Sequence, residues 1–260
     1  MQRGLPVGAP VATRARERSP GAHRDEPIRR RVELLAEAVR AADASGRLDG
    51  PEAGSCLREL ACAAEGPSAF TVRHLERLGR YVEVLARSLG WPDERCEALR
   101  LASELHDIGK VGVPDEVLRS EGVFTRDDRQ MMERHVLIGH DLLAGCEAPL
   151  LDLAATIALN HHERYDGTGY PNGLRGTAIP IEARIVAIAD VFDALTTERR
   201  YKRAMNLNQA RVLMLANRGT HFDAHLLDAF LDQAPVLEDV RRAWSDPMRQ
   251  RPPRSIVARR

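Results

Sequence analysis

The sequence predicts an all-α protein, and three features of its pattern support that fold class. Apolar residues recur three and four positions apart through most of residues 28–230, which is the spacing of one helix face. The alternation of apolar and polar residues that is typical of strands is absent. Glycine and proline mark the boundaries between the periodic segments. We therefore expect a helical bundle into which several helices project polar side chains.

The first periodic segments predict a short helical hairpin. Its two helices are separated by Asp49-Gly50-Pro51, a run that breaks a helix. The apolar positions are Ile28, Val32, Leu35 and Val39, followed by Cys56, Leu60 and Ala64. The hairpin is too short for a known sensor module. Two roles stay open for it, namely packing against the main domain and dimerisation.

Six further helices are expected in the main domain, and their boundaries follow from capping residues. Asp93, Thr125 with Asp128, and Asp223 are typical helix-starting residues. Gly109 is expected to stop the second of these helices. The expected helices cover residues 74–89, 93–107, 125–142, 150–162, 180–195 and 223–230.

The chain of 260 residues is long enough for one domain with a full core and a smaller appendage. Both ends are rich in arginine, and we expect solvated basic tails there. The first of them has no interleaved aromatics, which disfavours nucleic acid as a partner. The expected division is a disordered basic tail over residues 1–27, the hairpin over 28–66, the main domain over 67–235, and a basic C-terminal tail over 236–260.

Composition excludes some classes of protein. No segment approaches the run of about 20 apolar residues that a membrane span requires, and the N-terminus has no apolar core of a secretory signal. The cysteines do not form a Cys-x-x-Cys pattern, which favours reduced thiols in a cytoplasmic protein. They are Cys56, Cys62, Cys96 and Cys146.

Potential metal ligands follow one another in a distinctive order. A lone histidine on an apolar helix face is usually a hydrogen-bonded core residue. Several imidazoles that converge in one bundle would repel one another if protonated and need partners if neutral, and a metal supplies that partner. Ligands of this kind, without thiolates, suit Fe, Mn, Zn or Co. The residues are His74, His106-Asp107, His135, His161-His162 and Asp190, with Asp166-Gly167-Thr168-Gly169-Tyr170-Pro171 before the last.

From about Thr71 to Phe230 the chain resembles the HD-GYP family, bacterial metal-dependent phosphodiesterases that hydrolyse cyclic di-GMP. The resemblance implies two divalent metal ions, Fe or Mn. It assigns His74, His106, Asp107 and Asp190 to one ion and His135, His161 and His162 to the other, with Asp107 bridging. Some members hold a third ion through a Glu one turn before the first His. Phe70 stands there, so we expect a dinuclear site.

The resemblance also implies roles for residues around the ligands. A metal-bound hydroxide would attack phosphorus, and Lys110 would stabilise charge or protonate the leaving oxygen. Arg199 and Lys202 match phosphate-binding positions. Gly169, Tyr170 and Pro171 would line the substrate cleft, with Tyr170 stacking on guanine. Glu163 is expected to orient the His pair.

Lysine usage supports a functional Lys110, because Lys110 and Lys202 are the only two lysines in the chain. Codon bias is the plainer explanation of that scarcity. Both lysines nevertheless lie in motifs where an ammonium group that can give up a proton would be useful.

The leading hypothesis is a cyclic di-GMP phosphodiesterase that produces linear pGpG, with GMP as an open further product. The alternatives are a module that senses the nucleotide or docks partners without turnover, and a phosphohydrolase for another cyclic dinucleotide such as cyclic GMP-AMP. A homodimer and protein partners in a signalling pathway stay open.

Overall fold

A computed structural model describes residues 26–48, 50–66, 68–120, 123–198 and 203–245. In these ranges the protein is helical, with two isolated β-bridges and no strand, which confirms the all-α prediction. The elements, of which η1 and η2 are 3₁₀ helices, are α1 (Glu26–Ala44), α2 (Ala53–Glu65), α3 (Ala69–Ser88), α4 (Asp93–Ser103), η1 (Ile108–Gly112), α5 (Asp115–Leu118), α6 (Arg126–Glu133), α7 (His135–Leu143), α8 (Pro149–Asn160), η2 (Gly176–Ala178), α9 (Ile181–Thr196), α10 (Leu207–Leu215), α11 (Ala224–Leu231) and α12 (Ala234–Ala243).

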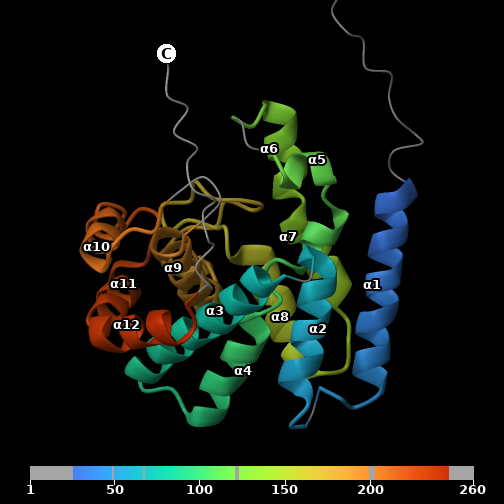
Figure 1. Cartoon of the computed structure of the whole chain (residues 1–260), viewed down its shortest axis with the longest axis horizontal. Helices are drawn as coiled ribbons and strands as arrows, with labels where there is room; N and C mark the ends of the chain where they lie inside the picture. The colour runs from blue at the N-terminus through green and yellow to red at the C-terminus, as the bar shows by residue number, and fades with distance from the viewer. Residues whose placement is uncertain (1–25, 49, 67, 121–122, 199–202, 246–260) are drawn as a thin grey trace, which may run out of the picture.

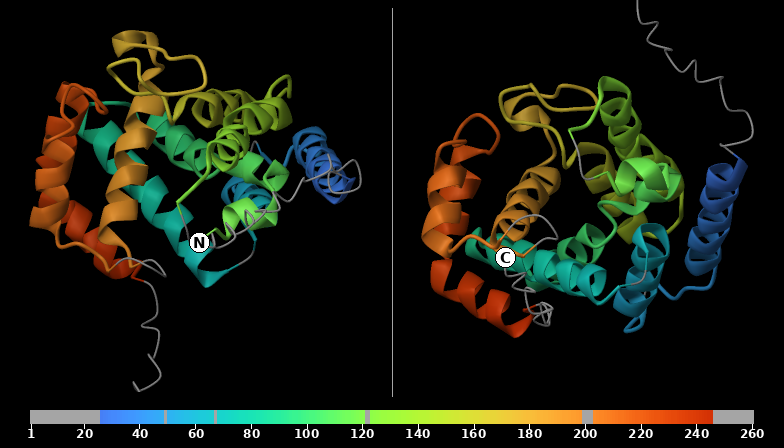
Figure 2. Two further views of the ribbon diagram at one scale, coloured as in Figure 1. Left: turned by 90° about the horizontal axis from the view of Figure 1, so that it is seen from above. Right: turned by 45° about the horizontal axis from the view of Figure 1, so that its top comes forward.

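Helix α3 is the centre of the bundle. It packs against α4 and α9, and also against α2, α11 and α12. Its apolar stripe, which includes Leu78, Val82 and Leu85, is fully buried. In Figure 1 and in the turned views of Figure 2, α1 lies at one side of the molecule and α10 to α12 lie at the other, with α3, α4, α8 and α9 between them.

The N-terminal hairpin packs against the main domain, which is the first of the two roles considered for it. Both α1 and α2 contact η1. Arg31 Nη1 lies 2.8 Å from Asp115 Oδ1. The Asp43 carboxylate accepts hydrogen bonds from the backbone N–H groups of Glu147 and Ala148, at the start of α8, both at 2.9 Å. The hairpin therefore braces elements that carry predicted metal ligands.

Two of the expected main-domain helices have different bounds. The helix expected over 93–107 begins after Pro92 and ends at Ser103, so Asp93 is its first residue and not its cap. The next turn leads into η1, which contains Gly109. The helix expected over 125–142 is divided at Arg134 into α6 and α7. At that division the Met132 carbonyl contacts His135 Nδ1 at 2.6 Å.

Gly109 explains the first of these differences. A Cβ atom at this position would lie 1.9 Å from the His135 carbonyl oxygen and 2.4 Å from the Gly139 nitrogen. The glycine therefore allows η1 to pack directly on the backbone of α7. Contrary to the expectation from the sequence, it lies inside η1 and does not end a long helix.

Helices α10 and α12 were not expected. Asn206 begins α10 with a capping box that includes Gln209. Most of α12 lies in the range we assigned to a C-terminal tail, yet it packs on α3 and buries Leu237. The expected starts at Thr125 with Asp128 and at Asp223 are confirmed. Among the described helices, none has the length and apolar character needed to cross a membrane.

Candidate metal centre

All seven predicted ligands come together in two neighbouring groups. They arrive from five places in the chain: α3, the turn after α4, the start of α7, the two residues that follow α8, and α9. Within each group the ligand atoms lie within 4.8 Å of one another. One group consists of Asp107, His135, His161 and His162, and the other of His74, His106 and Asp190.

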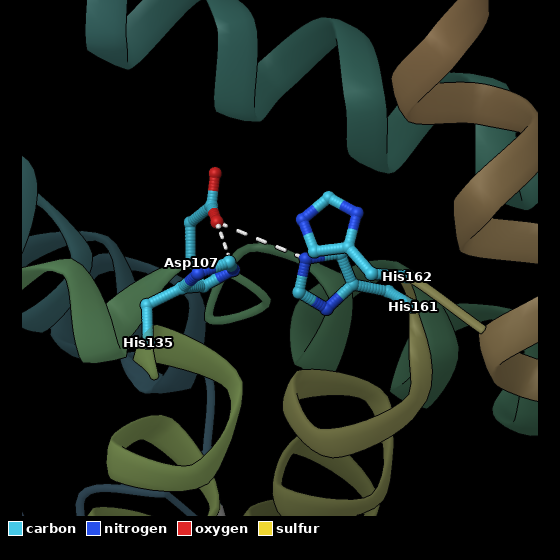
Figure 3. A group of neighbouring side chains, drawn as sticks. All are labelled: Asp107, His135, His161 and His162. Carbon is cyan, nitrogen blue, oxygen red and sulfur yellow. Dashed lines mark ion pairs between the residues drawn. The ribbon is translucent and has the colours of Figure 1, made fainter. Parts of the chain in front are cut away.

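The first group is arranged around the Asp107 carboxylate. Figure 3 shows this carboxylate beside the rings of His135 and His161, with His162 next to His161. Asp107 Oδ1 lies 3.3 Å from His135 Nε2 and 3.8 Å from His161 Nε2. The ring centroids of His161 and His162 are 4.0 Å apart.

Asp107 also connects the two groups. Its other oxygen, Oδ2, lies 3.1 Å from His106 Nε2, which belongs to the second group. The His106 ring in turn meets the His74 ring at a centroid distance of 5.6 Å. One carboxylate therefore directs an oxygen toward each group, which is the arrangement a bridging ligand needs.

Backbone carbonyls orient three of the imidazoles. The Nδ1 atoms of His106 and His135 contact the carbonyls of Ser103 and Met132, at 3.0 and 2.6 Å. His161 Nδ1 contacts the Ala158 carbonyl at 3.1 Å. A carbonyl only accepts hydrogen bonds, so each Nδ1 carries a proton, and in the neutral ring Nε2 presents its lone pair to the site.

The donor atoms fit a divalent metal. His106 Nε2, His135 Nε2, His161 Nε2 and Asp107 Oδ1 are buried, and none has a hydrogen-bond partner among the described residues. Leaving buried polar atoms unsatisfied costs about 1–3 kcal/mol each. Metal coordination would satisfy all four. The set contains imidazole and carboxylate donors without thiolate, which suits Fe, Mn, Zn or Co.

Electrostatics keep most of these groups in the form that binds metal. Burial lowers the pKa of His161 well below its usual value and lowers that of His162 to about 4, so both rings are neutral. Burial also disfavours the charged form of His106, but Asp107 outweighs it and raises the pKa to about 9. Burial opposes ionisation of Asp107 as well, yet Lys110 and His106 hold its pKa well below the usual range. The electrostatic field that favours a proton on His106 would equally favour a metal cation.

Lys110 lies directly beside this centre. It belongs to η1, and its ammonium pairs with Asp107 Oδ2. About a quarter of its side chain (27%) is exposed to solvent. Burial would lower the pKa of Lys110, but Asp107 outweighs it and raises that pKa above its usual value.

The loop over residues 163–176 contacts the ligand group through Tyr170. A Cβ atom on Gly169 would lie within 2.6 Å of backbone atoms of His162, Glu163 and Arg164, so only glycine fits there. The Tyr170 ring stacks on the His162 ring, with centroids 4.9 Å apart. Pro171 follows in the same loop, and Arg199 and Lys202 lie outside the described residues.

Glu163 differs from its expected role. Its buried carboxylate accepts hydrogen bonds from the backbone N–H groups of Asn172, at 2.7 Å, and Leu174, at 2.9 Å. It therefore fastens the loop and does not orient the His pair. The physical reason is that the loop folds back over Glu163 and presents two amide donors to it.

Two residues at the site were not predicted, namely Asp193 and Arg77. Asp193 Oδ2 lies 2.7 Å from His74 Nδ1, and Arg77 Nε donates to Asp193 Oδ1 at 2.6 Å. Burial opposes ionisation of Asp193, but His74 and Arg77 outweigh it and lower the pKa to about 2. The sequence feature that could have indicated Asp193 is a second aspartate three residues after Asp190 in the apolar segment 185–195.

Comparison with known proteins agrees with this geometry. The HD domain family profile matches residues 61–226 of the chain. This protein belongs to the HD-domain family, in its HD-GYP group. The cyclic di-GMP phosphodiesterase response regulator RpfG of Xanthomonas campestris is 45% identical to this chain, over 71% of this chain and 49% of its own length.

A second relative and a solved structure extend the comparison. The 3'3'-cGAMP-specific phosphodiesterase 2 of Vibrio cholerae is 40% identical over 72% of this chain and 36% of its own length. This chain thus spans about half or less of the length of these curated relatives. Among solved structures, Bd1817 of Bdellovibrio bacteriovorus, an HDG"Y"P protein, has a TM-score of 0.53 at 19% identity, covering 82% of this chain and 74% of its own. That likeness supports the shared fold.

Proposed function

We propose that this protein is a dinuclear metal-dependent phosphodiesterase that opens cyclic di-GMP to linear pGpG. The observation that carries the proposal is the convergence of seven ligands in two groups that Asp107 connects, with four buried donor atoms that have no hydrogen-bond partner among the described residues. The names of the related proteins supply the substrate class, because RpfG and the Vibrio relative are phosphodiesterases for cyclic dinucleotides.

The ligands divide between two ions in the proposed site. His74, His106 and Asp190 would hold one ion, and His135, His161 and His162 would hold the other, with Asp107, which contacts both groups, as a ligand common to the two. We propose Fe or Mn for both. When bound, such a pair polarises the phosphoryl oxygens and makes a water nucleophilic at neutral pH.

Lys110 supplies the catalytic cation in this proposal. Its ammonium already lies beside Asp107, on the exposed side of the ligand group. From there it stabilises negative charge on the phosphate and can donate a proton to the leaving ribose oxygen. The raised pKa keeps it in the charged form that both roles require.

The loop next to His162 is the proposed base-binding wall. Tyr170 is about half-buried and held by its stack on His162, so it is positioned to receive a base with little loss of conformational freedom. Gly169 and Pro171 set the course of the backbone there. Arg199 and Lys202 are proposed to bind the phosphates, on sequence grounds.

A second substrate has one specific observation in its favour. The Vibrio relative named for cyclic GMP-AMP is 40% identical to this chain, compared with 39% for a Vibrio relative named as a probable cyclic di-GMP phosphodiesterase and 45% for RpfG. A non-hydrolytic sensor is disfavoured, because such a module has no need of a complete ligand set. The free cysteines of the described chain support a cytoplasmic location. We leave a homodimer and signalling-protein partners as further proposals.

The test is a product assay with reduced, Mn- or Fe-loaded protein on cyclic di-GMP and 3'3'-cyclic GMP-AMP. The proposal expects linear pGpG from the first, and none from an Asp107→Ala variant. Faster opening of cyclic GMP-AMP would change the substrate but keep the reaction. Fully metal-loaded protein that binds cyclic di-GMP for hours without forming product would show a sensor instead.

A further inference from the structure

His74 is held differently from the other buried ligand histidines. The Nδ1 atoms of His106, His135 and His161 contact backbone carbonyls. His74 Nδ1 instead contacts a side-chain carboxylate, Asp193 Oδ2, at 2.7 Å. A carboxylate in this position fixes the ring orientation and makes the opposite nitrogen a stronger donor to a metal.

Asp193 is in turn fixed by Arg77. Both side chains are only 1% exposed. Arg77 donates through Nε to Oδ1 at 2.6 Å and through Nη2 to Oδ2 at 3.1 Å, which is a two-pronged grip. Thr197 Oγ1 adds a weaker contact with Oδ1, at 3.3 Å. The carboxylate therefore has little freedom to rotate away from His74.

The same guanidinium reaches the C-terminal helix. Arg77 Nη1 donates to the Trp244 carbonyl at 2.9 Å, directly after α12. Arg73, one turn earlier on α3, donates to the Ser245 carbonyl. Helix α12 lies beyond residues 61–226, the segment that matches the HD domain family. An element outside that segment is thus joined, through Arg77 and Asp193, to a metal ligand.

We propose that Asp193 and Arg77 are positioning residues that hold His74 ready for its metal ion, and that the end of α12 completes their support. This inference rests on the metal site of the proposed function. Loss of such a partner behind a ligating histidine typically weakens metal affinity about 10–100-fold. The ion held by His74 should be affected, and the ion held by His135, His161 and His162 should be retained.

The first test compares Asp193→Asn with wild type in the full-length protein. The variant keeps the size of the side chain and removes its charge. Metal content is measured after dialysis against graded concentrations of chelator, with Mn as the probe. We expect one of the two ions to be lost at about 10–100-fold lower chelator strength, and the other to remain.

A control substitution separates this effect from the loss of a two-pronged ion pair as such. Asp228 forms a two-pronged pair with Arg218 at 2.6 and 2.9 Å, but both side chains are well exposed and far from the ligand groups in sequence. Asp228→Asn should leave the metal content unchanged. The thermal midpoint of the metal-free proteins is recorded as well, because a merely structural role would lower it without changing metal affinity.

Arg77→Lys is a second variant for the same measurement, for use if Asp193→Asn does not fold. A lysine retains the positive charge beside Asp193 but cannot make the two-pronged grip. It should weaken the same ion, by a smaller factor. Wild-type affinity for both ions in every variant that folds would overturn the inference, and so would equal weakening of both ions. Metal binding is measured without nucleotide, so failure of the wild type to hydrolyse cyclic di-GMP would count against the proposed function alone.

Discussion

The metal centre and the loop beside it are held in place by different means. In the centre, backbone groups hold the ligands in place. Backbone carbonyls orient three imidazoles, and Gly109 allows η1 to pack against α7. In the loop, one carboxylate, that of Glu163, holds two backbone amides. The geometry of the centre therefore depends on close packing of helices, whereas the course of the loop depends on one side chain. Substitutions in the two regions should therefore have separable effects.

The largest expected effect comes from the residue that joins the two ligand groups. Asp107→Ala removes the carboxylate that contacts histidines of both groups and leaves Lys110 without its partner there. We expect loss of both metal content and turnover, as measured by elemental analysis and product formation. Retention of two ions in a folded Asp107→Ala protein would show that Asp107 does not bridge them.

The packing of the centre is tested by Gly109→Ala. The new Cβ would meet backbone atoms of α7 at 1.9 and 2.4 Å, and backbone cannot move aside cheaply. We expect the free energy of unfolding to fall by about 3 kcal/mol or more, together with metal affinity. Denaturant titration provides the measurement.

A second glycine in a helix serves as the control for that substitution. At Gly54 a Cβ would meet only the Leu101 side chain, at 3.1 Å. Gly54→Ala should therefore change stability by no more than about 1 kcal/mol. Similar losses for the two variants would mean that the close contact between η1 and α7 is unimportant.

Lys110→Arg tests the chemical role of the ammonium. Guanidinium keeps the positive charge, but it is larger and planar, so it cannot take the place of a compact ammonium beside Asp107. Turnover should drop about 10²–10⁴-fold with unchanged metal content, because Lys110 does not ligate in this proposal. Near-normal turnover would leave codon bias as the explanation for the scarcity of lysine.

The smallest effect is expected in the loop. Glu163→Gln keeps one acceptor oxygen and loses the charge, so one of the two backbone amides is left unsatisfied. A lost charge-assisted hydrogen bond costs about 1.5–3 kcal/mol, or roughly ten- to a hundredfold in kcat/KM if the loop must be ordered on substrate binding. Metal content should stay at the wild-type value. Loss of metal would indicate that Glu163 orients the His pair after all.

The two regions also differ in how far the sequence alone could define them. The ligands were predictable because His and Asp residues in one order on apolar helices point to few chemistries, and all seven converge in the structure. The turn that carries His106-Asp107 was not predictable, because it leads into η1, and η1 depends on a tertiary contact of Gly109 with α7. Asp193 was overlooked because its partners, His74 and Arg77, lie more than 110 residues earlier in the chain. Helix α12 was missed because its arginine-rich end resembles a solvated tail.

The most direct test of the central claim is anomalous diffraction from crystals of the Mn- or Fe-loaded protein. The account predicts two peaks per chain about 3.5–4 Å apart, one beside His74, His106 and Asp190 and one beside His135, His161 and His162, with Asp107 between them. It predicts no third peak, because Phe70 stands where a further carboxylate would be needed. A single peak, or three, would contradict the dinuclear site.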